Sequence, residues 1–401
     1  MVSRARLMGL NGPKVSNLRF VVNLQKSHGS YVFSDTHGKK LLDMFGNISS
    51  LPLGYNHPRI LNAVRDHTYL VAQRQANGVF PALEHRSLLR GTLTRILPQG
   101  FCSETSFIHT DQSGSCAVEN MVKCLYARIL REGKSTDIPL ISFEGGFHGR
   151  TLGSLSLTHS NKLHKDGFPT IHTQKARIPL ADDSKDEVAS CLDEMEDLLS
   201  NEVAGVIVEP VQAEGGDRYP HSDFLRVVRN ICKSRSVPFI VDEVQTGLYG
   251  TGLLWGYEHH NLDYPPDGLI FSKRTQIPGF FAKSWLTPSF DYQCFNTWMG
   301  DTIFGVILEE ILNEIEEKNL IQNMAECGRI LRDGLEVHPS TRNVRGLSTF
   351  LAFDVDERDA FVRRAENSGI VVGSCGDTSI RLRPPLNLSP EECFKFLELL
   401  P

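Results

Sequence analysis

Charged side chains follow three short apolar runs of this chain, and their positions suggest catalysis. Glu209 ends one run, Asp242 lies near the end of Val237–Glu243, and Lys273 ends Gly268–Lys273. An unpaired carboxylate at the rim of an apolar sheet is costly, so it requires a cation or a protonated ring nitrogen. A lysine amine held there has a lowered pKa and can form a Schiff base or act as a base. For each residue alone, a salt bridge, a helix cap or an exposed side chain is the commoner role.

Two glycine-containing turns could bind an anionic ligand. Gly114 and Ser115 precede a helical pattern, and free N–H groups at a helix N-terminus favour phosphate. Phe147, in the turn after another apolar run, could stack on a planar ring, and Arg150 could bind a carboxylate through both arms of its guanidinium. A plain helix start and a tight turn with a surface arginine are the competing interpretations.

Five apolar runs bounded by turn residues predict buried strands of a mostly parallel sheet. The runs are Thr105–His109, Ile138–Phe143, Ala204–Glu209, Val237–Glu243 and Gly268–Lys273. Helical patterns alternate with them, for example at Phe224–Cys232, where Ser222 is the expected N-cap. This alternation predicts an α/β fold with helices on both faces of the central sheet, and ligands bind at the carboxyl edge of such a sheet.

The predicted strand ends bring a phosphate turn, an aromatic ring, an aspartate and a lysine to one edge of one sheet. Pyridoxal 5'-phosphate uses that combination, because its phosphate needs N–H donors and its ring needs an apolar face. Its pyridine nitrogen needs an acid that keeps it protonated, and its aldehyde needs a lysine. We therefore predict this cofactor.

The C-terminal third follows a different pattern. A long helical stretch covers Ile303–Leu335, and a small α+β domain with a strand at Ser379–Arg383 follows. Its last helix begins with a capping box formed by Ser389 and Glu392. We expect an N-terminal arm and part of the small domain over residues 1–50, a large cofactor-binding domain over 51–300, a linking helical segment over 301–343 and a small C-terminal α+β domain over 344–401.

The composition excludes several classes of function. The 401 residues carry a net charge of -6, so no basic excess is available for nucleic-acid phosphates, and no apolar run approaches the roughly 20 residues that span a bilayer. Nine cysteines without CxxC spacing predict reduced thiols and no metal site. Adjacent His259 and His260 are expected at a solvated helix end. We expect the cytoplasm, with the mitochondrial matrix as the alternative, because the first acidic residue is Asp35 and five basic residues precede it.

Motifs along nearly the whole chain make it resemble the class III pyridoxal-phosphate aminotransferases, and among them the 4-aminobutyrate aminotransferases of eukaryotes. The matching stretches are Ile48-Ser49-Ser50, Gly114-Ser115-Cys116, Phe147-His148-Gly149-Arg150-Thr151, Val208-Glu209-Pro210, Glu214-Gly215-Gly216-Asp217, Val241-Asp242-Glu243-Val244-Gln245-Thr246-Gly247, Phe271-Ser272-Lys273, Phe295-Asn296-Thr297-Trp298 and Ser379-Ile380-Arg381. Motifs of this length in this order are specific. The resemblance implies a fold type I pyridoxal-phosphate transferase that acts as a homodimer.

The resemblance also implies which residues react with the cofactor and bind its phosphate. Lys273 would form the Schiff base and then move a proton between the substrate carbon and the cofactor. Asp242 would pair with the pyridine nitrogen. Gly114 and Ser115 would bind the phosphate, together with Thr297 from the other subunit, so each active site would need two chains.

Four further residues would complete the cofactor site according to the resemblance. Phe147 would stack on the ring, and Gln245 would lie near its phenolic oxygen. Glu209 would support the site from beside the cofactor, and His148 would be a cofactor-binding residue in the same motif as Phe147.

The substrate residues implied by the resemblance fit an ω-aminotransferase. Arg150 would hold the distal carboxylate of an ω-amino acid, Arg381 the α-carboxylate of glutamate, and Ile48 would line the substrate channel. Glu214 would pair with Arg381 when 4-aminobutyrate is bound and release it for glutamate. The implied reaction moves the amino group of 4-aminobutyrate to 2-oxoglutarate and gives succinate semialdehyde and glutamate.

Departures from the family pattern keep alternatives open. Animal 4-aminobutyrate aminotransferases carry a cysteine where this chain has Ser113, so one thiolate ligand is lost and we predict no iron-sulfur cluster. Asn161 replaces a family lysine. β-Alanine or another amine in a biosynthetic pathway is therefore an alternative donor, and a non-catalytic relative is a further alternative. A nicotinamide-dependent oxidoreductase is disfavoured, because Gly250 and Gly252 lie too far beyond the end of their strand.

Overall fold

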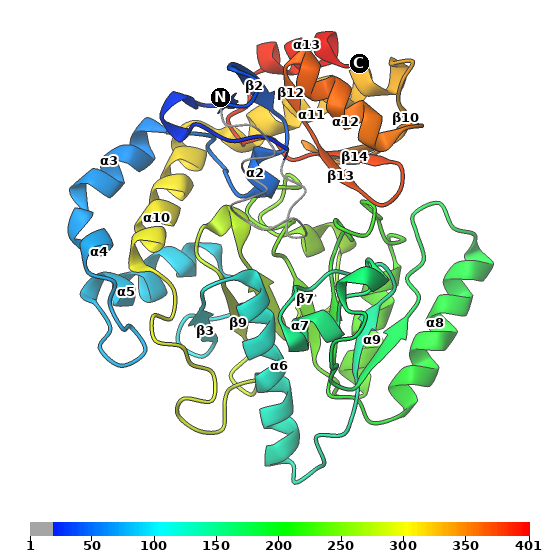
Figure 1. Cartoon of the computed structure of the whole chain (residues 1–401). Helices are drawn as coiled ribbons and strands as arrows, with labels where there is room; N and C mark the ends of the chain where they lie inside the picture. The colour runs from blue at the N-terminus through cyan, green and yellow to red at the C-terminus, as the bar shows by residue number, and fades with distance from the viewer. Residues whose placement is uncertain (1–18) are drawn as a thin grey trace. The chain divides into compact units, whose positions relative to one another are not determined.

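The computed structural model describes residues 19–401, which form two compact units (Figure 1). Unit 2 is the continuous stretch His67–Glu309, and unit 1 combines residues 19–66 with Glu310–Pro401. This division differs from the expected boundaries at residues 50, 300 and 343. Helix α10 (Thr302–Glu317) runs across the boundary after Glu309, so no change of composition marks that boundary. The expected linking segment belongs largely to unit 1.

Unit 2 contains a seven-stranded sheet with the order β3-β9-β8-β7-β6-β4-β5. Its strands are β3 (Phe107–Thr110), β4 (Leu140–Phe143), β5 (Thr173–Ala176), β6 (Gly205–Val208), β7 (Phe239–Asp242), β8 (Gly268–Phe271) and β9 (Gly279–Ala282). Strand β9 is antiparallel to both of its neighbours, whereas the other pairings are parallel. The prediction of a mostly parallel sheet is confirmed, and all residues of β4, β6, β7 and β8 are buried, as their continuous apolar sequences require.

Two strands of this sheet, β5 and β9, were not among the predicted ones. Strand β9 has the sequence Gly-Phe-Phe-Ala, which is too short to show a period. Gly279 is required at its start, because a Cβ there would lie 2.2 Å from the carbonyl oxygen of His109 in the paired strand β3. The position of β9 therefore depends on the close approach of two backbones, which the sequence does not reveal.

Helices cover both faces of the sheet, as expected. Leu140 of β4 belongs to the core cluster that contains the apolar face of α6 (Gly114–Arg131). Phe143, three positions along the same strand, packs edge-on against Phe224 of α9 (Phe224–Ser234), with ring centroids 6.0 Å apart. Because successive strand residues point to opposite faces, α6 and α9 lie on opposite sides of the sheet (Figure 1).

The other helices of unit 2 are α4 (Thr68–Ala72), α5 (Leu83–Ser87), α7 (Leu152–Ser156) and α8 (Lys185–Ser200). The prediction of Ser222 as the N-cap of α9 is wrong, since Asp223 occupies that position without a capping side-chain hydrogen bond. A turn in which the Phe224 N–H donates to the His221 carbonyl, over 3.0 Å, moves the helix start one residue further along the chain.

Unit 1 contains a four-stranded and a three-stranded sheet. The first has the order β10-β11-β14-β13, with β10 (Arg342–Leu347), β11 (Phe350–Asp354), β13 (Gly373–Cys375) and β14 (Ser379–Leu382), and the second has the order β1-β2-β12, with β1 (Tyr31–Ser34), β2 (Lys39–Asp43) and β12 (Ile370–Val371). Its helices are α2 (Gly46–Ser49), α3 (Pro58–Asp66), α11 (Leu320–Val337), α12 (Arg358–Ser368) and α13 (Pro390–Leu399). One buried cluster joins α11, α12, α13 and the sheets.

Two predictions for the C-terminal third have different outcomes. The capping box of Ser389 and Glu392 is confirmed at the start of α13. The long helical stretch is two helices, because Asn319 between α10 and α11 has a left-handed φ of 52°. Within residues 19–401, no helix has the length and apolar character needed to cross a membrane.

Candidate active site

A cavity of about 200 Å³ lies in unit 2 where β4, β6, β7 and β8 end. The lining residues come from the turns at these strand ends and from the first turn of α6, namely Ser113, Gly114, Ser115, Phe147, His148, Gly149, Glu209, Asp242, Val244, Gln245, Ser272 and Lys273. The structure thus brings together eight of the nine residues that the sequence placed around the cofactor, and Thr297 is the exception. These residues come together because the parallel strands end at the same edge of the sheet.

Asp242 is the buried acid of the cavity, and His148 holds it. Nδ1 of His148 lies 2.8 Å from Oδ2 of Asp242, and both side chains are buried. The other carboxylate oxygen accepts the N–H of Val244 at 3.1 Å. The backbone N–H of His148 donates to Thr158 Oγ1 at 3.0 Å, which anchors the turn that carries the imidazole. His148 therefore orients the aspartate as well as lining the cavity.

Glu209 supports the turn that carries Phe147. Its Oε1 accepts the backbone N–H of Phe147 at 2.8 Å. Burial, followed by the charge of Asp242, raises the pKa of Glu209 well above its usual value, and the N–H groups of Phe147 and Ala213 and the charge of Lys273 oppose that shift. The carboxyl group thus binds a proton more readily than an exposed glutamate and contributes less negative charge to the cavity.

The first turn of α6 forms a tight cradle at the cavity. Ser113 is its N-cap, and the hydroxyl oxygen accepts the Cys116 N–H at 3.2 Å. A Cβ on Gly114 would lie 3.1 Å from both methyl groups of Val244, so only glycine fits without displacing a neighbour. The unpaired N–H groups of a helix start are suited to a phosphate, and Ser115 adds a hydroxyl.

Lys273 has a strained backbone at the end of the cavity. It follows β8 and has a φ of 50°, in the left-handed region. Such a conformation costs a non-glycine residue roughly 1–3 kcal/mol, and strain of this kind gathers at functional sites. The buried neighbours Phe271 and Arg274 hold the segment on both sides of the lysine. The lysine side chain lines the same cavity as Asp242.

Arg150 is exposed beside the cavity and contacts two side chains. Its guanidinium carbon lies 5.6 Å from the ring centroid of Phe147, and Nη2 lies 3.4 Å from Nε2 of His164. A guanidinium only donates hydrogen bonds, so Nε2 of His164 accepts and the imidazole proton lies on Nδ1, which is buried without a hydrogen-bond partner. Burial and then the charge of Arg150 lower the pKa of His164, and Glu214 opposes the shift.

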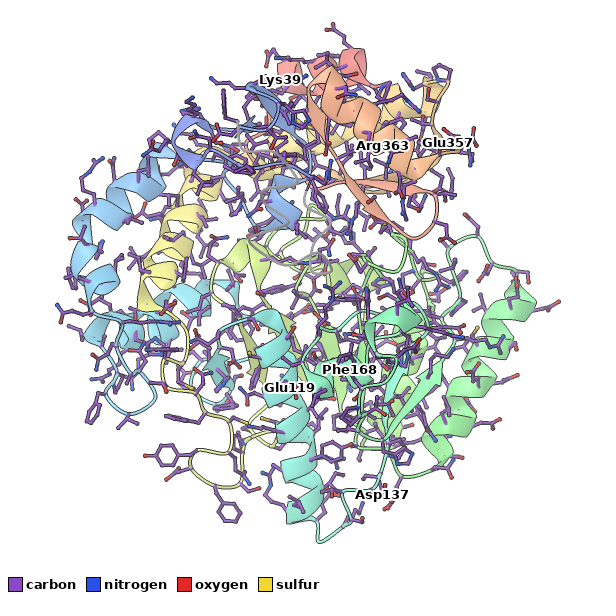
Figure 2. All side chains as sticks on the ribbon, in the orientation of Figure 1. Lys39, Glu119, Asp137, Phe168, Glu357 and Arg363 are labelled. Carbon is purple, nitrogen blue, oxygen red and sulfur yellow. The ribbon has the colours of Figure 1, made fainter. Side chains whose placement is uncertain are left out.

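His164 was not predicted from the sequence. It ends a short 3-10 helix (Lys162–His164) after α7, where neither a strand end nor a motif marks it. The turn that leads to it is tied to α6, since the carboxylate of Glu119 accepts the N–H groups of Gly153 at 2.8 Å and Ser154 at 3.1 Å. Glu119 is labelled on α6 in Figure 2. Contacts between distant segments, rather than spacing, place the imidazole against Arg150.

Besides Arg150, four predicted site residues do not line this cavity, namely Glu214, Thr297, Ile48 and Arg381. Glu214 is half-buried in the segment after β6. Thr297 is exposed, and its neighbour Asn296 donates to Oδ1 of Asp111 at 2.8 Å, close in sequence to the phosphate turn. Ile48 and Arg381 belong to unit 1. Ile48 is 52% exposed, whereas Arg381 on β14 is buried with its guanidinium carbon 5.2 Å from the Phe45 ring centroid.

The segment that carries Ile48 is a left-handed turn. Gly46, Asn47, Ile48 and Ser49 all have φ between 49° and 64°, which is rare for a β-branched residue. The carboxylate of Asp43 stabilises the turn by accepting the N–H groups of Phe45, Gly46 and Asn47 over 2.9–3.2 Å. Ile48 is therefore presented on a fixed, strained turn rather than on a flexible loop.

The histidine pair after Trp255 differs from its prediction. His260 is buried, with Nε2 3.0 Å from the carbonyl oxygen of Pro210, so it is not at a solvated helix end. Burial lowers its pKa to about 4. Among residues 19–401, no cluster of three or more histidine, cysteine, aspartate or glutamate side chains could hold a metal ion.

The donor set of the cavity fits pyridoxal phosphate. Gly114 leaves no room for a side chain in the first turn of α6, so a phosphate could approach the backbone N–H groups and the Ser115 hydroxyl there. Asp242 is buried and hydrogen-bonded to an imidazole and a backbone N–H, so a cationic pyridine nitrogen would balance its charge. Phe147 offers a ring face and Lys273 an amine. Each functional group of the cofactor has a matching group here.

Comparisons with known proteins identify the family that this chain resembles. A family model described as aminotransferase class-III matches residues 13–401. The mitochondrial 4-aminobutyrate aminotransferase of Rattus norvegicus is 35% identical over 426 residues, covering 95% of this chain and 84% of the relative. The 4-aminobutyrate aminotransferase of Dictyostelium discoideum is 36% identical and covers 98% and 86%. A solved lysine aminotransferase from M. tuberculosis superposes with a TM-score of 0.87 at 26% identity, covering 99% of this chain and 98% of that one.

Proposed function

The chain belongs to the class III aminotransferase family, and on that premise we propose that it transfers the amino group of 4-aminobutyrate to 2-oxoglutarate. It is a pyridoxal-phosphate-dependent transaminase. The products would be succinate semialdehyde and glutamate. The observation that carries the choice of donor is the exposed Arg150 guanidinium over the ring of Phe147, which lines the same cavity as Lys273, because this guanidinium can bind a carboxylate at a distance from the amine that reacts.

Bound pyridoxal phosphate supplies an electron sink for the negative charge that develops at the amino carbon of the substrate. The other roles belong to this chain. Lys273 Nζ would move the proton between the substrate carbon and the cofactor, and Asp242, oriented by His148, would keep the pyridine nitrogen protonated. Phe147 would exclude water from the ring face, and Gln245 would act near the phenolic oxygen.

The substrate roles of Arg150, Arg381, Glu214 and Ile48 are part of the same proposal. 4-Aminobutyrate has one carboxylate and glutamate has two, yet both must present the amino carbon to the same cofactor atom. Arg150 would bind the distal carboxylate, and Arg381 the α-carboxylate of glutamate. Glu214 would neutralise Arg381 when only one carboxylate is present, and the fixed turn at Ile48 would line the channel.

We infer that the enzyme is a homodimer in which Thr297 reaches the phosphate of the partner subunit. Support comes from exposed apolar side chains on two adjacent segments of unit 2, namely Val79, Phe80, Leu83, Phe290 and Tyr292. The segments lie side by side, since a Cβ on Gly78 would meet the Phe295 ring at 2.3 Å and Arg74 stacks over Trp298 at 3.6 Å. Exposed apolar side chains gathered on adjacent segments favour association.

Two further proposals concern an iron-sulfur cluster and the cellular compartment. Ser113 takes the place of a cluster cysteine and caps α6 instead, so we propose that no iron-sulfur cluster forms. We propose the cytoplasm as the compartment, with the mitochondrial matrix as the alternative, since the rat relative is named mitochondrial and the Dictyostelium relative is not.

An absorbance titration of the purified holoenzyme tests the proposed donor. Adding 4-aminobutyrate should convert the cofactor to its amine form, with loss of the band above 400 nm, and 2-oxoglutarate should restore that band. The matched control is Arg150→Gln, which should respond to 4-aminobutyrate only at much higher concentration. A wild-type holoenzyme that responds to β-alanine or a diamine but not to 4-aminobutyrate would overturn the donor and keep the reaction type.

A further inference from the structure

A second and larger hollow lies in unit 2, far along the strands from the active site. Its volume is about 440 Å³, within the range of small-molecule sites. It is lined by Arg128, Arg131, Glu132, Arg229, Cys232, Lys233, Ser236, Val237, Asp267 and Trp285. Val237 lies two residues before β7 and Asp267 directly precedes β8, so this hollow is at the amino edge of the parallel strands, whereas the candidate active site is at the carboxyl edge.

The hollow is positively charged on a negatively charged protein. Four cationic side chains and two carboxylates line it, although the whole chain has a net charge of -6. Arg229 and Asp267 neutralise each other through two hydrogen bonds of 2.9 and 3.0 Å. The charges that remain are those of three cations, Arg128, Arg131 and Lys233, and of one carboxylate, Glu132. An anion is the ligand that this imbalance favours.

Arg128 is held in place with unused hydrogen-bonding capacity. Its Nη1 donates to Glu132 Oε1 at 2.6 Å, while its Nε is buried without a hydrogen-bond partner. The guanidinium is only 14% exposed, so it is not a freely solvated surface group. Basic residues at a helix C-terminus often compensate the helix dipole, but that role does not account for a buried, unpartnered donor beside a hollow.

Trp285 supplies a rigid aromatic wall. Its side chain is 44% exposed, although a tryptophan is among the most costly residues to leave in water. Arg131 fixes the segment, because its guanidinium donates to the carbonyl oxygens of Trp285 at 2.8 Å and Thr287 at 2.6 Å and to Ser289 Oγ at 3.1 Å. The indole is thus presented on an anchored segment beside the cationic groups.

We propose that this hollow, at the amino edge of the unit 2 sheet, is a binding site for a small anion of nucleoside monophosphate type, which joins a phosphate to a planar base. The phosphate is bound by Arg128 and Lys233, and the base stacks on Trp285. The apolar side chains of Val237 and Cys232 form the inner wall. The proposal is independent of the amino donor, because none of these residues lines the catalytic cavity.

Calorimetric titration of the holoenzyme with AMP tests this site. The holoenzyme is used because its own phosphate position at Gly114 and Ser115 is then filled. We expect saturable binding of one AMP per chain, weakened about tenfold or more by Arg128→Gln and by Trp285→Ala. Adenosine alone and inorganic phosphate alone should each bind about tenfold more weakly than AMP.

Lys134→Gln is the matched control. Lys134 also carries a positive charge near Glu132, but it lines only the adjoining hollow and pairs with Glu132 at 3.1 Å and Glu202 at 3.2 Å. AMP binding should be nearly unchanged by this substitution, and all variants should keep the wild-type thermal unfolding midpoint. Quenching of tryptophan fluorescence should disappear in Trp285→Ala. Absence of saturable binding at about 10 mM AMP, or equal weakening by Lys134→Gln, would overturn the proposal.

Discussion

Asp242 and Asp267 lie at opposite ends of neighbouring parallel strands. Their surroundings differ, because those of Asp242 suit a reaction and those of Asp267 suit a stable fold. Both are buried, at 5% and 7% exposure. Asp267 faces the guanidinium fork of Arg229 and also accepts the Phe239 N–H, so a permanent cation neutralises it in place. Asp242 is held by Nδ1 of His148 and the N–H of Val244, and within residues 19–401 neither a guanidinium nor an ammonium group is hydrogen-bonded to it. The acid that must receive a cationic ligand is thus oriented by an imidazole and a backbone N–H rather than by an arginine or a lysine.

The largest effect is expected from the lysines at the two edges of the sheet. Lys273→Arg removes the amine that can form a Schiff base, and loss of the proton-transferring group alone should lower kcat by about 10²- to 10⁴-fold. Lys233→Arg keeps the charge at the amino edge and should leave kcat unchanged. Steady-state kinetics of both variants checks this. Full activity of Lys273→Arg would remove the catalytic distinction between the two edges.

The aspartates themselves give the second test. Asp267→Asn leaves the buried Arg229 without its partner and should lower the free energy of unfolding by about 3–5 kcal/mol, with kcat per folded molecule unchanged. Asp242→Asn should lower kcat by about 10²-fold or more and change stability less, because His148 can still hydrogen-bond the amide. Urea unfolding and kinetics are measured on both variants. If the two substitutions affected stability and kcat alike, the comparison would fail.

A third carboxyl group, that of Glu243, extends the comparison because its contribution to stability depends on pH. Burial raises its pKa to about 7, against the hydrogen bonds from Thr246, Tyr257 and Gly256. The unfolded carboxyl has a pKa near 4.5, so the contribution to stability is fully present below that pH and is lost as the pH rises to 7. The loss should be on the order of 3 kcal/mol.

Glu243→Gln is the variant that isolates this pH dependence. The difference in unfolding free energy between the wild-type protein and this variant should change between pH 4.5 and 7 and be flat above 8. A difference that stays constant across the whole range would show that Glu243 is ionised in the folded protein at acidic pH. The measurement is urea unfolding at several pH values.

The smallest effect is expected at His164, which orients Arg150 at the carboxyl edge. His164→Ala removes one hydrogen bond to the guanidinium, a loss of about 1 kcal/mol, so KM for 4-aminobutyrate should rise roughly fivefold with kcat little changed. His164→Gln, whose side-chain oxygen can accept from Arg150, should restore most of the lost affinity. A fall in kcat without a change in KM would contradict a positioning role.

Much of the cofactor edge was predictable because strand ends are local features. The runs ending near Glu209, Asp242 and Lys273 marked β6, β7 and β8, and the parallel arrangement then placed their end residues together. The capping box of α13 was equally local. Family motifs added Gln245 and His148, which no spacing argument would have selected.

The features that were missed depend on contacts between distant segments. His164 reaches Arg150 only because Glu119 ties α7 to α6. The boundary between the units falls inside the continuous helix α10, and burial of His260 depends on the carbonyl of Pro210, 50 residues away. Neither composition nor periodicity carries such information.

Strand β9 has a consequence for the order in which the protein is made. In the seven-stranded sheet, β3 pairs with β9 alone, although about 170 residues separate the two in the chain. A ribosome therefore delivers β4 to β8, which pair with one another, before it delivers the strand that attaches β3. Until then β3 has an unpaired edge, so the early nascent chain is the stage at which a chaperone or a wrong partner has most access to it.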